Sequence, residues 1–127
     1  MTKHRMIYIY GSKRSGRTTA LVNEIKKALC RGHKVAIASC DMKSIDFLKR
    51  SIDMSDISPE FIHVVDEIKK IKNESDIRGL NRPLFVDNFD YLDPGFREAI
   101  IDYSLFYPVV VTLRIEGELQ PVLGEDK

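Results

Sequence analysis

The sequence predicts an α/β fold, a three-layer α/β/α sandwich around a mainly parallel sheet of five strands. Short apolar runs alternate with segments of helical periodicity along the chain. The turns that separate these segments are brief, as in βαβ units. A glycine-rich stretch joins the first apolar run to the first helical segment. Together these observations favour parallel strands with helices on both faces of the sheet.

Length and composition limit the classes of protein to consider. The 127 residues are enough for one domain with a sizeable core, which we place at 1–115, followed by a short polar C-terminal tail at 116–127. A formal net charge of +1 gives no global electrostatic case for binding nucleic acid or an anionic membrane. Apolar runs are too short to span a bilayer, and the basic start leads into a strand rather than a signal sequence. We therefore expect a cytoplasmic protein with no membrane partner.

The first βα unit is the clearest local prediction. Met6 to Tyr10 is apolar and rich in β-formers, so it predicts a central strand. A helix is expected over 18–31 because its apolar residues follow helical spacing, and Gly32 stops it. The chain then returns as a strand over 34–40.

The remaining elements follow from the same signals. We expect, in chain order, a helix over 41–51 with Asp41 as its N-cap, a loop over 54–60, a strand over 61–65, a short helix over 66–71, a mobile polar loop over 73–82, a strand over 84–87, a helix over 93–104 and a strand over 108–113. His63 is expected to be a core or edge residue rather than a catalyst. Arg78 and Arg82 are expected to be exposed arginines, the alternative being that either swings towards a nucleotide or contacts a partner. Cys30 and Cys40 lack partners at metal-ligand spacing, which predicts reduced thiols.

Residues 11–18, Gly-Ser-Lys-Arg-Ser-Gly-Arg-Thr, match a phosphate-binding loop with one departure. Glycines let successive backbone N–H groups face inward, and the following helix directs its N-terminal donors to the same place. Arg17 stands where the pattern has lysine, and it keeps the charge on a longer, planar and forked side chain. The alternative is a glycine-rich strand-to-helix turn without a ligand. The predicted phosphate contacts come from Gly11, Ser12, Lys13, Arg14, Ser15, Gly16, Arg17, Thr18 and Thr19.

A second feature is the apolar strand that ends in Asp87. In proteins with a phosphate loop, a carboxylate in this place holds Mg²⁺, together with the loop hydroxyl, here that of Thr18. Near the end of the last strand, Thr112 or Arg114 is placed to sense a terminal phosphate.

The loop and the acid-ended strand resemble the Walker A and Walker B motifs of P-loop NTPases. The order of elements is similar to the RecA-like division, which includes helicases, AAA+ ATPases and phage terminase ATPases. The resemblance implies ATP or another NTP as ligand with Mg²⁺, held at Thr18 and Asp87, and a sensor role at Thr112. It also implies self-association or a protein partner, and by analogy alone a nucleic acid partner, in phage or bacterial DNA transactions, in the host cytoplasm if the chain is phage-encoded.

Two departures from the family pattern bear on catalysis. Arg17 replaces the lysine, and Asn88 stands where the family carries the glutamate that polarises the attacking water. Losing a general base removes about 10²–10⁴-fold in rate. Asp90 points the same way as Asn88 if the backbone stays extended, so it is a candidate substitute. The candidate catalytic residues are therefore Asp87, Asn88 and Asp90.

These observations leave three functions open. The first is a small ATP-binding protein with slow or partner-dependent hydrolysis, a weak ATPase. The second is a catalytically degenerate P-loop fold that serves as an interaction or regulatory module. The third is a nucleoside kinase resembling thymidine kinase, which is disfavoured because the paired-cysteine zinc segment of that family is missing here.

Overall fold

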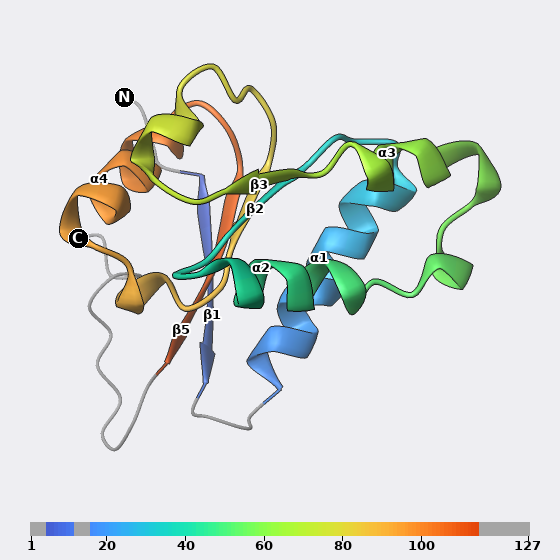
Figure 1. The fold of residues 1–127 in the computed structure, drawn as a ribbon, viewed down its shortest axis with the longest axis horizontal. Helices are drawn as coiled ribbons and strands as arrows, with labels where there is room; N and C mark the ends of the chain where they lie inside the picture. Colours follow the sequence, from blue (N-terminus) through green and yellow to red (C-terminus); the bar gives the residue numbers. More distant parts are fainter. Residues whose placement is uncertain (1–4, 12–15, 115–127) are drawn as a thin grey trace.

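The computed structural model describes residues 5–11 and 16–114, which form an α/β fold around a five-stranded sheet (Figure 1). The strands lie in the order β1 (Met6–Gly11), β5 (Val109–Arg114), β4 (Leu84–Val86), β2 (Ala36–Ala38) and β3 (Lys69–Ile71). Every neighbouring pair is parallel. The predicted α/β class and five-stranded parallel sheet are therefore confirmed, but β1, predicted to be a central strand, lies at one edge of the described sheet.

Helices cover both faces of this sheet. On one face, α1 (Arg17–Cys30), α2 (Met42–Arg50) and α3 (Ile62–Asp66) share an apolar cluster with strand residues that include Ile37, Phe85 and Val110. On the other face, α4 (Pro94–Tyr103) and the 3₁₀ turn η3 (Glu74–Ile77) pack with Val109 and Val111. Neighbouring residues of β5 thus belong to opposite clusters, as the alternation of a strand requires. Figure 1 shows α4 and α1 on opposite sides of the strands.

Local capping signals place several helix ends as predicted. The Asp41 carboxylate accepts a hydrogen bond of 2.8 Å from the backbone N–H of Ser44 at the start of α2. Helix α4 begins at Pro94, directly after Asp93. Proline suits this first position because the N–H that it lacks would have no partner within the helix.

The predicted strand over 61–65 and helix over 66–71 are wrong, because the structure has the reverse order. Residues 62–66 form α3, and the strand β3 follows at 69–71. Phe61, Val64, Val65 and Ile68 all contact the same apolar cluster, and their spacing of three and four is helical. The β-branched run suggested a strand, but this periodicity decided the structure. His63 lies exposed on α3 rather than in a strand.

The polar stretch over 73–82 is folded rather than an irregular loop. Asn73 and Asp76 form a capping box around η3, and Ile77 and Leu80 are buried against the sheet. Arg82 is half-buried, and its guanidinium donates to the backbone oxygens of Val35 and Glu67, which precede β2 and β3. The guanidinium therefore lies at the amino ends of the strands, whereas the predicted phosphate loop follows the carboxyl end of β1.

Other predictions are tested in part. None of the helices in the described ranges has the length and apolar character needed to cross a membrane. Cys30 and Cys40 are both free and exposed. Residues 12–15 of the predicted phosphate loop and the tail at 116–127 lie outside the described residues.

Candidate functional site

The candidate site lies where β1, β5 and β4 end. Strand β5 lies between the other two, with Gly11 opposite Arg114 and Val86 opposite Val111. The chain leaves β1 towards helix α1 on one face, whereas it leaves β4 towards α4 on the other. In open parallel sheets, a crevice that takes ligands forms at the carboxyl ends of strands whose connections diverge in this way.

Helix α1 begins beside these strand ends, after Gly16. The φ angle of Gly16 is +86°, a left-handed conformation that glycine adopts without strain. A Cβ atom at this position would meet none of the described residues within 4 Å, so among these residues the backbone conformation and not crowding favours the glycine. The first turn of α1 contains no acidic residue. The positive end of the helix dipole is thus left for an anion.

Arg17, the first residue of α1, joins the ends of two strands. Its Nη1 atom donates to the backbone oxygen of Gly11 over 2.8 Å, and its Nη2 atom donates to Oδ1 of Asn88, also over 2.8 Å. The guanidinium therefore reaches from the end of β1 to Asn88, which lies after β4, although β5 separates these two strands in the sheet. The two departures from the family pattern are in direct contact with each other.

Asn88 is in turn connected to a buried polar pair. Its backbone N–H donates to Oγ1 of Thr112 over 2.8 Å, and that hydroxyl donates to Oδ1 of Asp87 over 2.7 Å. Asp87 is 6% exposed and Thr112 is fully buried. A continuous series of hydrogen bonds thus leads from the N-terminus of α1 to the carboxylate at the end of β4. Buried polar groups in such a series are fixed in orientation, because breaking any bond leaves a buried group without its partner.

The backbone turns sharply after Asp87. Asn88 has φ of +54° and ψ of +51°, and residues 89–91 form the 3₁₀ turn η4 (Phe89–Tyr91). Asparagine is one of the few non-glycine residues that adopt this left-handed conformation readily. The extended backbone on which the catalytic candidacy of Asp90 depended is therefore absent, and that premise is wrong. Asp90 is half-buried within η4, and its backbone oxygen accepts a hydrogen bond from Arg97.

Most described members of the predicted site meet at this edge. Gly11, Gly16, Arg17, Asp87, Asn88 and Thr112 are linked by the hydrogen bonds and chain geometry above. Thr18 and Thr19 follow Arg17 in the first turn of α1, beside a hollow of about 230 Å³ that Phe47 of α2 also lines. Ser12, Lys13, Arg14 and Ser15 lie outside the described residues.

Sequence reasoning missed Ser39. This residue follows β2, is 1% exposed, and its hydroxyl donates to the backbone oxygen of Asp87 over 3.3 Å. The backbone N–H of Asp87 donates to the oxygen of Ala38 over 3.0 Å. The segment after β2 therefore supports the position of Asp87. A serine that ends an apolar run was the available signal, but its meaning depended on β2 lying beside β4.

The donor set is suited to Mg²⁺. The predicted ligands are the Asp87 carboxylate and the Thr18 hydroxyl, and both are hard oxygen donors of the kind that Mg²⁺ prefers. Within the described ranges, no group of three or more histidine, cysteine or acidic side chains could hold a metal ion.

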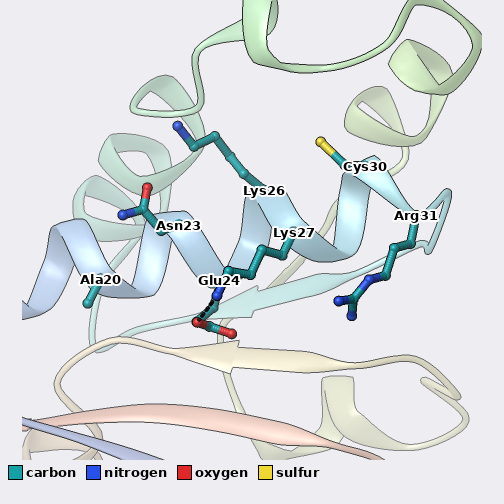
Figure 2. Close-up of a pocket in the computed structure, with 7 residues that line it drawn as sticks. All are labelled: Ala20, Asn23, Glu24, Lys26, Lys27, Cys30 and Arg31. Atoms are coloured by element: carbon teal, nitrogen blue, oxygen red, sulfur yellow. Dashed lines mark hydrogen bonds and ion pairs between the residues drawn. The ribbon is translucent and has the colours of Figure 1, made fainter.

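A larger groove lies elsewhere, along the outer side of α1. It has a volume of about 610 Å³ and is lined by residues from Ala20 to Arg31. Figure 2 shows Glu24 and Lys27 paired across one turn, with Arg31 beyond them at the far end of the helix. Both charge signs line this groove, and it does not reach the strand ends. We place the candidate site at the hydrogen-bonded series, where buried polar groups converge, and not in this groove.

No protein-family model matches the sequence, and no characterised protein matches it significantly. The case for a function therefore depends on the geometry described above.

Proposed function

We propose that this chain is a small P-loop protein that binds ATP or another nucleoside triphosphate with Mg²⁺ and hydrolyses it slowly or only with a partner. The observation that carries the proposal is the position of Arg17. Its guanidinium lies at the N-terminus of a helix, between the strand end that leads into the predicted loop and the strand end that carries Asp87. A cation and a helix N-terminus together form an anion-binding site.

The strand order further supports a ligand at this edge. Strand β5 separates the loop-bearing β1 from the acid-bearing β4, so the two motifs face the same crevice at a distance of two strand spacings. Strand spacings of about 4.8 Å put roughly 10 Å between the two strands. The Arg17 guanidinium bridges this span, so a phosphate chain would lie against it at the strand ends, with Thr18 and Asp87 as the ligands of its metal ion. Bound Mg²⁺ would supply positive charge to the phosphate oxygens.

Slow hydrolysis follows from the absence of a carboxylate at position 88. Asn88 has a carboxamide, which does not accept a proton from water as glutamate does. The turn at Asn88 also removes the extended geometry by which Asp90 could have substituted. Transfer of the phosphoryl group to water therefore lacks a general base at the position where the P-loop family has one. This lack lowers the rate of hydrolysis by about 10²–10⁴-fold.

A second candidate function is a degenerate P-loop fold that acts as an interaction or regulatory module. The contact between Arg17 and Asn88 favours it, because the side chain expected to grip phosphate is already engaged with protein acceptors. Nucleotide affinity distinguishes the two functions.

Isothermal titration calorimetry with ATP and Mg²⁺ is the direct test. We expect measurable binding that is weakened by Arg17→Ala by about 1.5–3 kcal/mol, the range for hydrogen bonds to charged groups. The matched control is Arg31→Ala, which removes an exposed arginine at the opposite end of the same helix and should leave affinity unchanged. Millimolar or undetectable binding by the wild-type chain would favour the module and overturn the proposal.

A further inference from the structure

We infer that Asn88 is the positioning residue for Arg17, and that its lack of charge keeps the Arg17 cation available to a phosphate. The two departures from the family pattern then form one unit, in which the asparagine compensates for the arginine. This inference rests on the proposed function, since phosphate is the anion that Arg17 would meet.

The geometry gives Arg17 two fixed points. One terminal nitrogen bonds the backbone oxygen of Gly11, and the other bonds Oδ1 of Asn88, each over 2.8 Å. A guanidinium has five N–H donors, so these two bonds leave donors for a ligand. Because the group is planar and rigid, holding it at two nitrogens also fixes the direction of the others. A flexible lysine could not be oriented in this way.

Asn88 is itself held in place. Its backbone N–H bonds the buried hydroxyl of Thr112, and its backbone has a left-handed conformation. The carboxamide oxygen is therefore a rigid acceptor, and its position is coupled to the Thr112–Asp87 pair. The position of the Arg17 guanidinium therefore depends on the segment that follows β4.

A carboxylate at position 88 would have a different effect on Arg17. Arginine and a carboxylate form bidentate, charge-assisted pairs about twice as strong as neutral hydrogen bonds. Such a pair would neutralise the cation and hold it against β4, so phosphate would have to displace the carboxylate. With lysine at position 17 this conflict is smaller, because a compact ammonium forms no forked pair. An arginine that reaches position 88 is thus compatible with phosphate binding when its acceptor there is uncharged.

The variant that tests this inference is Asn88→Asp, which adds charge with little change in shape. Aspartate tolerates the left-handed backbone nearly as well as asparagine. We expect the ligand-free variant to unfold about 2–6 °C higher, because a pair between two opposite charges replaces the hydrogen bond from the guanidinium to an uncharged carboxamide. We expect its affinity for ATP with Mg²⁺ to fall about 10–100-fold, because the pair must be broken. A purely structural role for Asn88 would not raise stability and lower affinity together.

The same exchange in an Arg17→Ala background separates sequestration of Arg17 from simple repulsion of phosphate. In the Arg17→Ala background, Asn88→Asp should not raise the melting temperature and should weaken ATP binding by less than about threefold. Equal losses of affinity in both backgrounds would show plain repulsion and overturn the inference. So would an Asn88→Asp chain that binds ATP as tightly as the wild type, although the proposed function would then stand. A wild-type chain that does not bind ATP would instead overturn the proposed function itself.

Discussion

Two half-buried arginines lie at opposite ends of the strands of the sheet, Arg17 at the carboxyl ends and Arg82 at the amino ends. They differ in their hydrogen-bond acceptors. At the carboxyl edge, Arg17 bonds one backbone oxygen and the side chain of Asn88. At the amino edge, Arg82 bonds two backbone oxygens, those of Val35 and Glu67, over 3.4 and 3.0 Å. The Tyr103 hydroxyl also accepts from the backbone N–H of Arg82 and donates to its backbone oxygen.

This difference separates structural from ligand-directed roles. Carbonyl oxygens at strand starts cannot move without disturbing the sheet, so Arg82 fastens three segments of chain together. Its Nε atom is buried without a hydrogen-bond partner in the described part of the chain, a cost to be set against the bonds that it makes. The two acceptors of Arg17 use two of its five N–H donors, so under the proposed function the other donors are left for a ligand. Substitutions at the amino ends of the strands should therefore change mainly the stability of the fold, and substitutions at the carboxyl ends should change mainly nucleotide binding.

The largest effect is expected from Arg82→Ala. This change removes two charged hydrogen bonds that connect the segments before β2, β3 and β4. We expect the free energy of unfolding to fall by about 2–4 kcal/mol, and ATP affinity to stay within about twofold of wild type. Urea unfolding and calorimetric titration measure the two quantities. Arg78→Ala, at an exposed neighbour in the same stretch, is the control and should change neither. A marked loss of ATP affinity in Arg82→Ala would remove the distinction between the edges.

A smaller loss of stability is expected from Thr112→Val at the carboxyl edge. Valine keeps the shape of threonine but leaves the buried Asp87 oxygen and the Asn88 N–H without their partner. The cost should be about 1–3 kcal/mol in unfolding free energy. Unlike Arg82→Ala, this change should also weaken binding of ATP with Mg²⁺, because it releases Asp87 and Asn88. Thr112→Ser retains the hydroxyl and should keep most of the affinity. If Thr112→Val binds nucleotide normally, the hydrogen-bonded series is not part of the site.

The smallest effect is a dependence on pH at the amino edge. Burial raises the pKa of the Tyr103 phenol above its ordinary value of 10.0, although its hydrogen bond with the Arg82 backbone acts in the opposite direction. The unfolded chain then loses this proton first, so stability should fall as pH rises from about 10 through the pKa of the folded state. Unfolding free energies measured between about pH 9 and pH 11, roughly one unit either side of the ordinary value of 10.0, should decline less steeply in Tyr103→Phe. Parallel profiles for the two chains would show that Tyr103 does not cause the decline.

The sequence was sufficient to predict those features that depend on local signals. The Asp41 cap, the start of α4 after Asp93 and the apolar strand ending in Asp87 were all placed correctly. Residues 61–71 were misassigned because a β-branched run outweighed a helical spacing in a short segment. Both patterns are present there, and packing against the apolar cluster of α1 and α2 decides between them.

The contacts of the candidate site could not be predicted in the same way. Asp87 and Thr112 were each placed near a strand end, but their hydrogen bond requires β5 to lie beside β4. The contact between Arg17 and Asn88 further requires the left-handed turn after Asp87. Strand order and turn conformation are properties of the whole fold. The residues of the site were therefore visible in the sequence as separate candidates, and their connection was not.

The position of β5 between β1 and β4 has a consequence for how the protein folds. Within the described part of the chain, β1 pairs with β5 alone, so the first strand gains its neighbour only when the last one docks. Contacts between segments so distant in sequence close late and slow the search for the native state. The same docking event brings Thr112 to Asp87 and aligns the ends of β1 and β4. Assembly of the binding edge should therefore coincide with completion of the sheet, and a partly folded chain that lacks β5 should have no affinity for nucleotide.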